Sequence, residues 1–131
     1  MFQRSLLLLF SLLVLSMATP TRRAWPSGSV TCGSNTYSLS AVKSAVSYGY
    51  SLIDDPIGSD SYPHTFHNYE GLDMWCSGES AYNEFPILKS GLYNGGSPGA
   101  DRVVFSDNDV YCAVITHTGA SGNHFVSCDG D

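Results

Sequence analysis

The pattern of apolar and polar residues divides the chain into an apolar leader, one helix and a series of short strands. Residues 38–53 carry apolar side chains three or four positions apart, at Leu39, Val42, Val46, Tyr50 and Ile53. This spacing predicts the buried stripe of an amphipathic helix, capped by Ser38 or Ser40. Asp54-Asp55-Pro56 ends the predicted helix, because proline lacks a backbone donor and disfavours helix in the residue before it.

Five short runs rich in Tyr, Phe, Val and Ile follow the helix, at residues 62–67, 81–88, 102–106, 110–117 and 124–128. Gly, Pro, Asn and Ser separate these runs, which is typical of strands joined by tight connections. One helix followed by about five strands predicts an α+β domain. We expect one amphipathic helix packed on a roughly five-stranded antiparallel sheet.

The leader has the composition of a secretory signal peptide. Arg4 provides a basic start, residues 6–15 are almost continuously apolar, and Ser16 and Ala18 place small residues at the positions that signal peptidase requires. The apolar run is shorter than the roughly 20 residues that a membrane span needs, so no membrane association is expected. We therefore expect a signal peptide at 1–18, a propeptide ending in the dibasic Arg22-Arg23 at 19–23, and one secreted, extracellular domain at 24–131.

The charge of the chain argues against a protein that binds nucleic acid through a broad basic surface. The whole sequence has 6 Lys plus Arg against 12 Asp plus Glu. Without residues 1–23, Lys43, Lys89 and Arg102 remain against all 12 acidic residues, a net charge of −9. Tight binding to polyanions through counterion release needs many basic contacts, so it is not expected here.

Cysteines and histidines suggest disulfides and give no sign of a metal site. An even number of cysteines in a small secreted chain indicates disulfides, but the spacing of Cys32, Cys76, Cys112 and Cys128 leaves three pairings open. His64 and His67 would point to opposite faces of a strand, so they do not form a compact ligand set. No metal and no cofactor are expected.

Five residues with acid–base or phosphate-binding chemistry lie on the predicted strands: Tyr62, His64, Glu84, Arg102 and His117. Taken singly, each of them is at least as well explained as a solvent-facing strand residue with no role in catalysis. As a set they are harder to dismiss, since the chain after residue 23 has one arginine and four histidines in all. An antiparallel sheet can bring all five onto one face.

Several sequence motifs closely resemble the fungal guanyl-specific ribonucleases, the family of ribonuclease T-one. They are Ser61-Tyr62-Pro63-His64, Asn68-Tyr69-Glu70-Gly71, Glu84-Phe85-Pro86-Ile87, the glycine-rich run from Gly95 to Phe105, and the run from Ile115 to Asn123. The resemblance extends from about Cys32 to Cys128. It implies an endoribonuclease that cleaves single-stranded RNA after guanosine, through a 2′,3′-cyclic phosphate that is then hydrolysed to a 3′-phosphate.

The resemblance also implies roles for individual residues. Glu84 is the general base, assisted by His64, and His117 is the general acid. Arg102 and Tyr62 bind the phosphoryl oxygens, with Phe125 as an apolar wall behind them. The chemistry agrees, because in-line attack on phosphorus needs a proton acceptor, a proton donor and fixed positive charge.

Guanine recognition is assigned by the same resemblance to the segment after the first of the five predicted strands. The Glu70 carboxylate accepts from the two adjacent donors of guanine, which adenine lacks, and Tyr69 stacks on the base. Backbone amides of residues 67–69 bind the other edge of the guanine ring, and Asn123 adds a backbone contact. The full predicted set is Phe66, His67, Asn68, Tyr69, Glu70 and Asn123.

The sequence departs from the family pattern at a few positions. His67 stands where an asparagine is usual, Phe66 replaces a tyrosine, and Thr36 replaces a cysteine of the family's short N-terminal bridge. Matching the remaining cysteines to the family implies the pairs Cys32–Cys128 and Cys76–Cys112.

Two alternatives to a guanyl-specific enzyme stay open at this point. A broader purine-specific ribonuclease would cleave after adenosine as readily as after guanosine. A secreted RNA-binding or effector protein on the same fold would have lost catalysis. The expected partner is single-stranded RNA; DNA is excluded because it lacks the 2′-hydroxyl nucleophile, and a monomer is expected.

Overall fold

The computed structural model describes residues 25–131, so the expected signal peptide (1–18), propeptide (19–23) and mature start at Ala24 lie outside the described residues. Within this range the elements follow in the order β1 (Val30–Cys32), β2 (Asn35–Tyr37), α1 (Leu39–Ser51), β3 (His64–Phe66), β4 (Tyr82–Pro86), β5 (Asp101–Ser106), β6 (Tyr111–Thr116) and β7 (Val126–Ser127). None of the helices in residues 25–131 has the length and apolar character needed to cross a bilayer.

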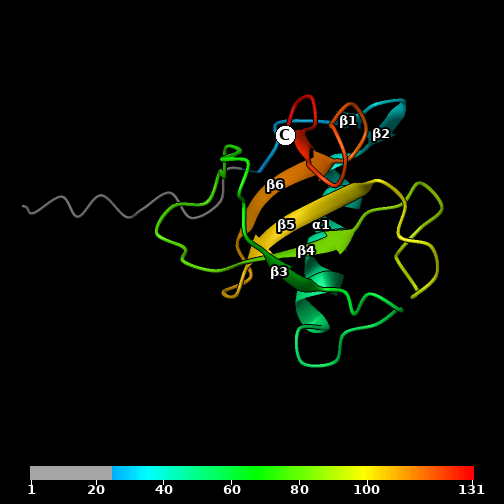
Figure 1. Ribbon diagram of the computed structural model, residues 1–131, viewed down its shortest axis with the longest axis vertical. Coiled ribbons are helices and arrows are strands. Elements are labelled where there is room, and N and C mark those ends of the chain that lie inside the picture. Colours follow the sequence, from blue (N-terminus) through cyan, green and yellow to red (C-terminus); the bar gives the residue numbers. More distant parts are fainter. Residues whose placement is uncertain (1–24) are drawn as a thin grey trace, which may run out of the picture.

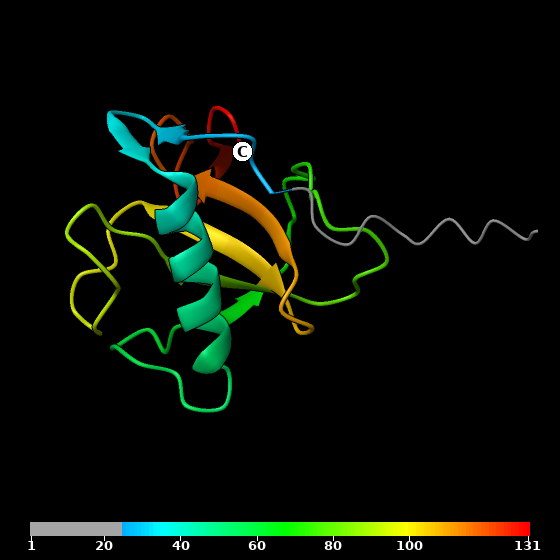
Figure 2. The ribbon, with the colours of Figure 1, turned by 180° about the vertical axis from the view of Figure 1, so that it is seen from behind.

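The last five strands form one antiparallel sheet in the order β3-β4-β5-β6-β7. The helix α1 crosses one face of this sheet and packs on β4 and β5 (Figures 1 and 2). The predicted α+β architecture, one helix on a five-stranded antiparallel sheet, is confirmed. The opposite face of the sheet carries a second, smaller apolar cluster that includes Val104, Cys112 and Ile115.

The helix begins at the predicted cap. The Ser38 hydroxyl accepts a hydrogen bond from the Ala41 backbone N–H at 3.1 Å, which satisfies a donor that the first turn leaves unpaired. Gly49 lies on the buried face, where an added Cβ would come within 2.8 Å of the Phe85 ring and 2.9 Å of the Phe105 ring. A side chain there would push α1 away from the sheet.

The hairpin formed by β1 and β2 was not predicted. Its strands are three residues long and include the polar Thr31 and Asn35, so they show no clear alternation of apolar and polar positions. Distant contacts hold the hairpin in place: Thr31 and Asp129 exchange two backbone hydrogen bonds of 2.8 and 2.9 Å. Pairing with the end of the chain is a tertiary effect that local sequence does not reveal.

Four of the five strands of the sheet are shorter than predicted, whereas β5 begins one residue earlier, and two candidate residues lie outside the strands that were expected to hold them. Tyr62 precedes β3 and pairs with Ile57 through two backbone hydrogen bonds of 2.8 Å. His117 follows β6, and its backbone N–H donates to the Ala100 carbonyl at 3.0 Å. Both residues are therefore fixed by local bridges next to strand ends instead of lying within the strands.

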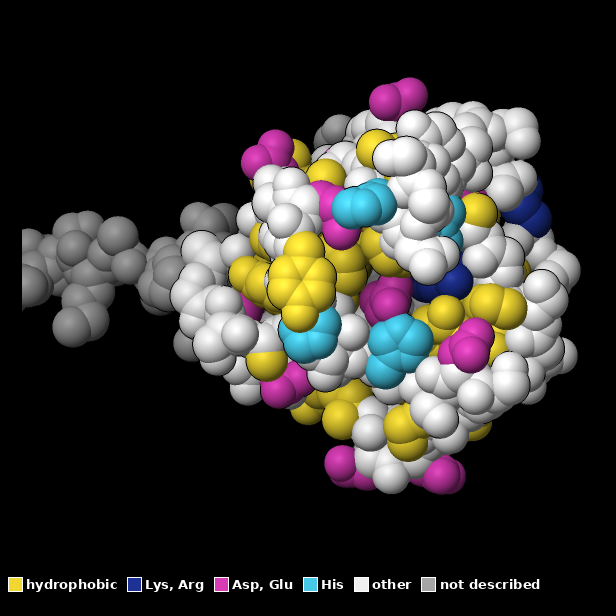
Figure 3. Space-filling view, in the orientation of Figure 1, with side chains coloured by type: hydrophobic (Ala, Val, Ile, Leu, Met, Phe, Trp, Pro, Cys, Tyr) yellow, Lys and Arg dark blue, Asp and Glu magenta, His cyan; other side chains and the backbone are white. Residues whose placement is uncertain are grey.

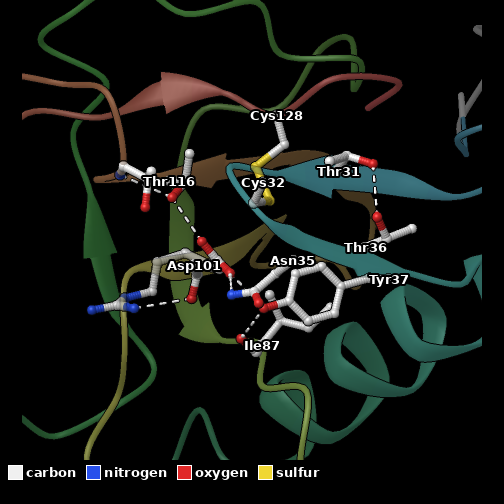
Figure 4. Close-up of a disulfide and its surroundings, with 11 residues drawn as sticks. Thr31, Cys32, Asn35, Thr36, Tyr37, Ile87, Asp101, Thr116 and Cys128 are labelled. Carbon is white, nitrogen blue, oxygen red and sulfur yellow. Dashed lines mark hydrogen bonds between the residues drawn. A yellow bond between two sulfur atoms is a disulfide. The ribbon is translucent and has the colours of Figure 1, made fainter.

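Two disulfides join distant parts of the chain: Cys32 to Cys128, and Cys76 to Cys112. These are the pairs that the family resemblance implies. The first ties β1 to the segment after β7 (Figure 4). The second ties the segment before β4 to β6 and lies in the apolar cluster on the face away from α1.

Candidate active site

The candidate catalytic residues lie on the face of the sheet that is turned away from α1. The register places His64 of β3 directly opposite Glu84 of β4, and Arg102 of β5 lies two pairs further along, opposite Pro86. In the view of this face, histidine side chains surround an acidic and a basic side chain (Figure 3). Sheet pairing therefore gathers groups that are up to 38 positions apart in the sequence.

Glu84 and His64 form a tightly paired acid–base unit. His64 Nε2 lies 2.5 Å from Glu84 Oε1, and its Nδ1 lies 3.0 Å from the Asp60 carbonyl oxygen. Both ring nitrogens thus face acceptors, an arrangement that suits the doubly protonated imidazolium. The hydrogen bond to Glu84 raises the pKa of His64 above its ordinary value, outweighing the opposing effect of partial burial.

Arg102 brings a permanent positive charge to the same place. The side chain is 3% exposed, and its Nη1 donates to the backbone oxygens of Pro98 and Gly99 at 3.2 and 2.8 Å. Its Nη2 donates to the Tyr62 hydroxyl at 3.0 Å. The glycine-rich loop before β5 thus supplies carbonyl acceptors that hold the guanidinium. The Nε atom lies 3.8 Å from Glu84 Oε2 and has no hydrogen-bond partner within residues 25–131.

Asp101 anchors the strand that carries Arg102. Its buried carboxylate accepts hydrogen bonds from Asn35 Nδ2 at 3.0 Å, from the Tyr37 hydroxyl at 2.5 Å and from the Thr116 hydroxyl at 2.7 Å (Figure 4). Burial and this carboxylate raise the pKa of Tyr37, which therefore stays a donor. A buried charge with three donors is well satisfied, so it fixes β5 between the β1–β2 hairpin and β6.

His117 is oriented by two contacts from the segment before β7. Its Nδ1 lies 2.8 Å from the backbone oxygen of His124, and its ring stacks on Phe125 with centroids 3.8 Å apart. Because a carbonyl oxygen only accepts, Nδ1 carries hydrogen and Nε2 is left as the ring nitrogen without a partner among residues 25–131. When the ring is protonated, Nε2 carries the second proton and can deliver it to a substrate.

A cavity of about 170 Å³ lies next to these groups. Thr65, Glu84 and Phe125 line this cavity. The rest of the lining is the complete predicted guanine-binding set: Phe66, His67, Asn68, Tyr69, Glu70 and Asn123. Glu84 lines the cavity and also pairs with His64. A nucleobase bound in the cavity would therefore place its attached sugar near the Glu84–His64 pair.

The loop around the cavity is shaped by Asn68. This residue has a positive φ of 53°, a conformation that asparagine tolerates better than most residues. Its side-chain amide both donates to and accepts from the backbone of Leu72, at 2.9 and 2.8 Å. The loop is thus closed on itself and directs Glu70 inward, while Tyr69 is 85% exposed and stacks in parallel on His67.

The Glu70 carboxylate has unused acceptor capacity. Its Oε2 is buried and has no hydrogen-bond partner in the described part of the chain, and its Oε1 lies 3.6 Å from His124 Nδ1. A buried unpaired carboxylate oxygen is costly, so a ligand with donors would be favoured there. Sequence reasoning gave no role to His124; its place between Asn123 and Phe125, two predicted site residues, was the available signal.

The comparisons with known proteins agree with this geometry. A family model described as ribonuclease matches residues 25–129. The guanyl-specific ribonuclease C2 of Aspergillus clavatus is 50% identical over 99% of this chain and 99% of its own length, and guanyl-specific ribonuclease T1 of Aspergillus oryzae is 54% identical over 86% and 92%. The solved structure of a ribonuclease from Hericium erinaceus aligns with a TM-score of 0.57 and 36% identity, covering 78% of this chain and 99% of that one.

Proposed function

The chain belongs to the ribonuclease family, and on this basis we propose that it is a secreted endoribonuclease that cleaves single-stranded RNA after guanosine without a metal. The observation that carries the proposal is the pairing of Glu84 with His64 beside a cavity in which a second carboxylate, Glu70, has a buried and unpartnered oxygen. One carboxylate is placed for proton transfer and the other for base recognition.

In the first step, Glu84 accepts the proton of the ribose 2′-hydroxyl. The 2′-oxygen attacks phosphorus, the bond from phosphorus to the 5′-oxygen breaks, and His117 Nε2 donates its proton to that departing oxygen. The products are a 2′,3′-cyclic phosphate and a free 5′-hydroxyl. In the second step the roles reverse: His117 accepts a proton from water, the water oxygen attacks phosphorus, and the bond from phosphorus to the 2′-oxygen breaks. Glu84 returns its proton to that 2′-oxygen, leaving a 3′-phosphate.

Charge that builds up on the phosphoryl oxygens is met by groups already in place. The Arg102 guanidinium is held by backbone carbonyls and by the Tyr62 hydroxyl, so little reorganisation is needed when a phosphate binds. The raised pKa of His64 keeps a second positive charge beside it. Phe125, stacked on His117, provides an apolar wall that keeps the ring in place.

Guanine selection follows from the donors and acceptors in the cavity. The Glu70 carboxylate accepts and cannot donate, so it suits the N1–H and exocyclic amine of guanine and offers no such pair to adenine. Tyr69 supplies an exposed ring for stacking on the base. Phe66 packs edge-on against Phe125, with centroids 5.7 Å apart, and so links the base cavity to the phosphate side of the site.

The remaining parts of the proposal concern substrate and setting. DNA has no 2′-hydroxyl and is not cleaved. The two disulfides and the apolar leader favour an extracellular protein, acting as a monomer and independently of membranes. A catalytically inactive effector is disfavoured because acid, base and phosphate-binding groups are all present and each is held by a hydrogen bond.

Glu70→Ala tests the choice of guanosine over a broader purine preference. We expect kcat/KM for GpC to fall by on the order of a hundredfold, since two hydrogen bonds to a charged group are lost, and kcat/KM for ApC to change little. Glu79→Ala is the matched control, because Glu79 bonds Asn108 away from the cavity. An equal fall in kcat/KM for GpC and for ApC would mean that Glu70 does not select the nucleobase.

A further inference from the structure

The His124 side chain lies at the rim of the base cavity and faces Glu70. Its Nδ1 is 3.6 Å from Glu70 Oε1, and the two side chains are 64% and 20% exposed. This distance is within reach of an ion pair but too long for a hydrogen bond. The carboxylate oxygen therefore has a cation-forming neighbour and still keeps its lone pairs free.

The backbone holds His124 in this position. Its N–H donates to the Ser121 carbonyl at 3.1 Å, and its own carbonyl accepts from His117 Nδ1 at 2.8 Å. The main chain at residue 124 thus serves the proposed general acid, while the side chain is free to turn toward Glu70. A small rotation of the ring would convert the ion pair into a hydrogen bond.

Other charged or titratable groups around the cavity have different partners. Glu84 is paired with His64 and lies 3.8 Å from Arg102, and the His67 ring stacks on Tyr69. Of the positively charged or chargeable groups in residues 25–131, His124 is the one placed within 4.0 Å of the Glu70 carboxylate.

We propose that His124 is a specificity-determining residue that makes guanine recognition depend on pH. In its protonated form the imidazolium holds the Glu70 carboxylate and competes with the two guanine donors for it. In its neutral form it releases the carboxylate to the base. This inference rests on the proposed role of Glu70 as the guanine acceptor.

The direction follows from the order in which the groups titrate. An ordinary histidine loses its proton near pH 6.5 and an ordinary glutamate near pH 4.3. Lowering the pH from about 8 to about 5 therefore favours the charged form of a histidine at pH values where carboxylates in general are still largely ionised. Exposed ion pairs shift an equilibrium by up to about fivefold, so acid should weaken guanine binding by about two- to fivefold.

The experiment measures the Kd of guanosine, which carries no phosphate, by calorimetry at about pH 5 and pH 8. His124→Gln removes the charge at both pH values, and His124→Lys keeps it at both. We expect wild type to bind about two- to fivefold more weakly than His124→Gln at the lower pH and equally at the higher one. The lysine variant should bind more weakly than His124→Gln at both.

The ratio of wild-type to variant Kd cancels the titration of the shared groups that the side chain of residue 124 does not contact, including Glu84, His64 and His117. Lys43→Gln is the matched control: it removes a positive charge on α1 that lies over the Trp25 ring and outside the cavity lining, so its ratio to wild type should be the same at both pH values. The inference would be overturned if the ratio of wild-type to His124→Gln Kd is the same at both pH values. It would also be overturned if wild type binds guanosine more tightly than His124→Gln at the lower pH.

Failure of the proposed function looks different. If Glu70→Ala binds guanosine as well as wild type at about pH 8, Glu70 is not the guanine acceptor and the premise fails. If Glu70→Ala binds guanosine at least about tenfold more weakly than wild type, the acceptor role of Glu70 stands. If the ratio of wild-type to His124→Gln Kd is then the same at both pH values, only the competition by His124 is refuted.

Discussion

The Glu84–His64 pair combines a proton acceptor with a positive charge. His64 donates to Glu84 and to the Asp60 carbonyl, and the bond to Glu84 is the largest cause of its raised pKa. A raised pKa in the folded state means that this pair stabilises the fold fully below about pH 6.5, the ordinary value. That contribution is lost as the pH rises through the folded-state pKa.

The pair can be tested with one substitution. In wild type, NMR titration of the His64 ring should give a midpoint above about 6.5, because the imidazolium donates to a carboxylate. In Glu84→Gln the midpoint should move down, since the amide bears no charge. The His124 ring, which does not contact Glu84, serves as the internal control; an unchanged His64 midpoint would remove Glu84 as the cause.

Loss of the acid should be more severe than loss of the base. We expect His117→Ala and Glu84→Ala each to reduce kcat by at least about a hundredfold, the usual contribution of a positioned acid or base. The effect on His117→Ala should be larger, because His64 lies next to Glu84 and can take over part of its role. Single-turnover kinetics on GpC measure both, and near-normal turnover by His117→Ala would contradict the acid assignment.

At the scale of elements, the site depends on the β3–β4–β5 register. One residue of slippage between β3 and β4 would turn either His64 or Glu84 to the face covered by α1. The register is supported by the buried Phe85 and Val103, which pair across β4 and β5 and pack toward the helix. Packing on one face of the sheet thus fixes chemistry on the other.

Sequence periodicity predicted some elements well and missed others for physical reasons. The spacing of Val42 and Val46 identified α1, because a helix with one buried face leaves a strong local signal. The β1–β2 hairpin left none, since it is held by bonds to Asp129 and by the Cys32–Cys128 disulfide. The orientation of the His124 ring toward Glu70 was equally invisible, because it arises from two loops meeting in space.

The Cys76–Cys112 disulfide connects the segment before β4 to the start of β6, the strand that His117 follows. Its partners are 36 positions apart, for which chain-entropy reasoning gives at most about 4 kcal/mol. Replacing both cysteines by alanine should lower the free energy of unfolding by about 2–4 kcal/mol, measured by urea titration. A loss below about 0.5 kcal/mol would mean that the bridge does not support the fold.

For the molecule as a whole, charge and function are reconciled by placing one arginine and the histidines on a single face of the sheet. Residues after 23 include Lys43, Lys89 and Arg102 against 12 acidic residues, and Arg102 lies within the site. The histidines gather on the same face (Figure 3). An acidic enzyme of this kind binds one phosphate and one nucleobase of the RNA and makes few other contacts with the polymer. It should therefore release its products readily.

The central claim is guanosine-specific, metal-independent cleavage of single-stranded RNA by the groups on this face. The most direct measurement is to digest a defined single-stranded RNA containing all four bases in the presence of EDTA, and to map each cut and each new 3′ end. We predict cuts after guanosine that leave 2′,3′-cyclic phosphates and then 3′-phosphates. Equal cutting after adenosine, activity abolished by EDTA and restored by one metal, or no cleavage would contradict the account.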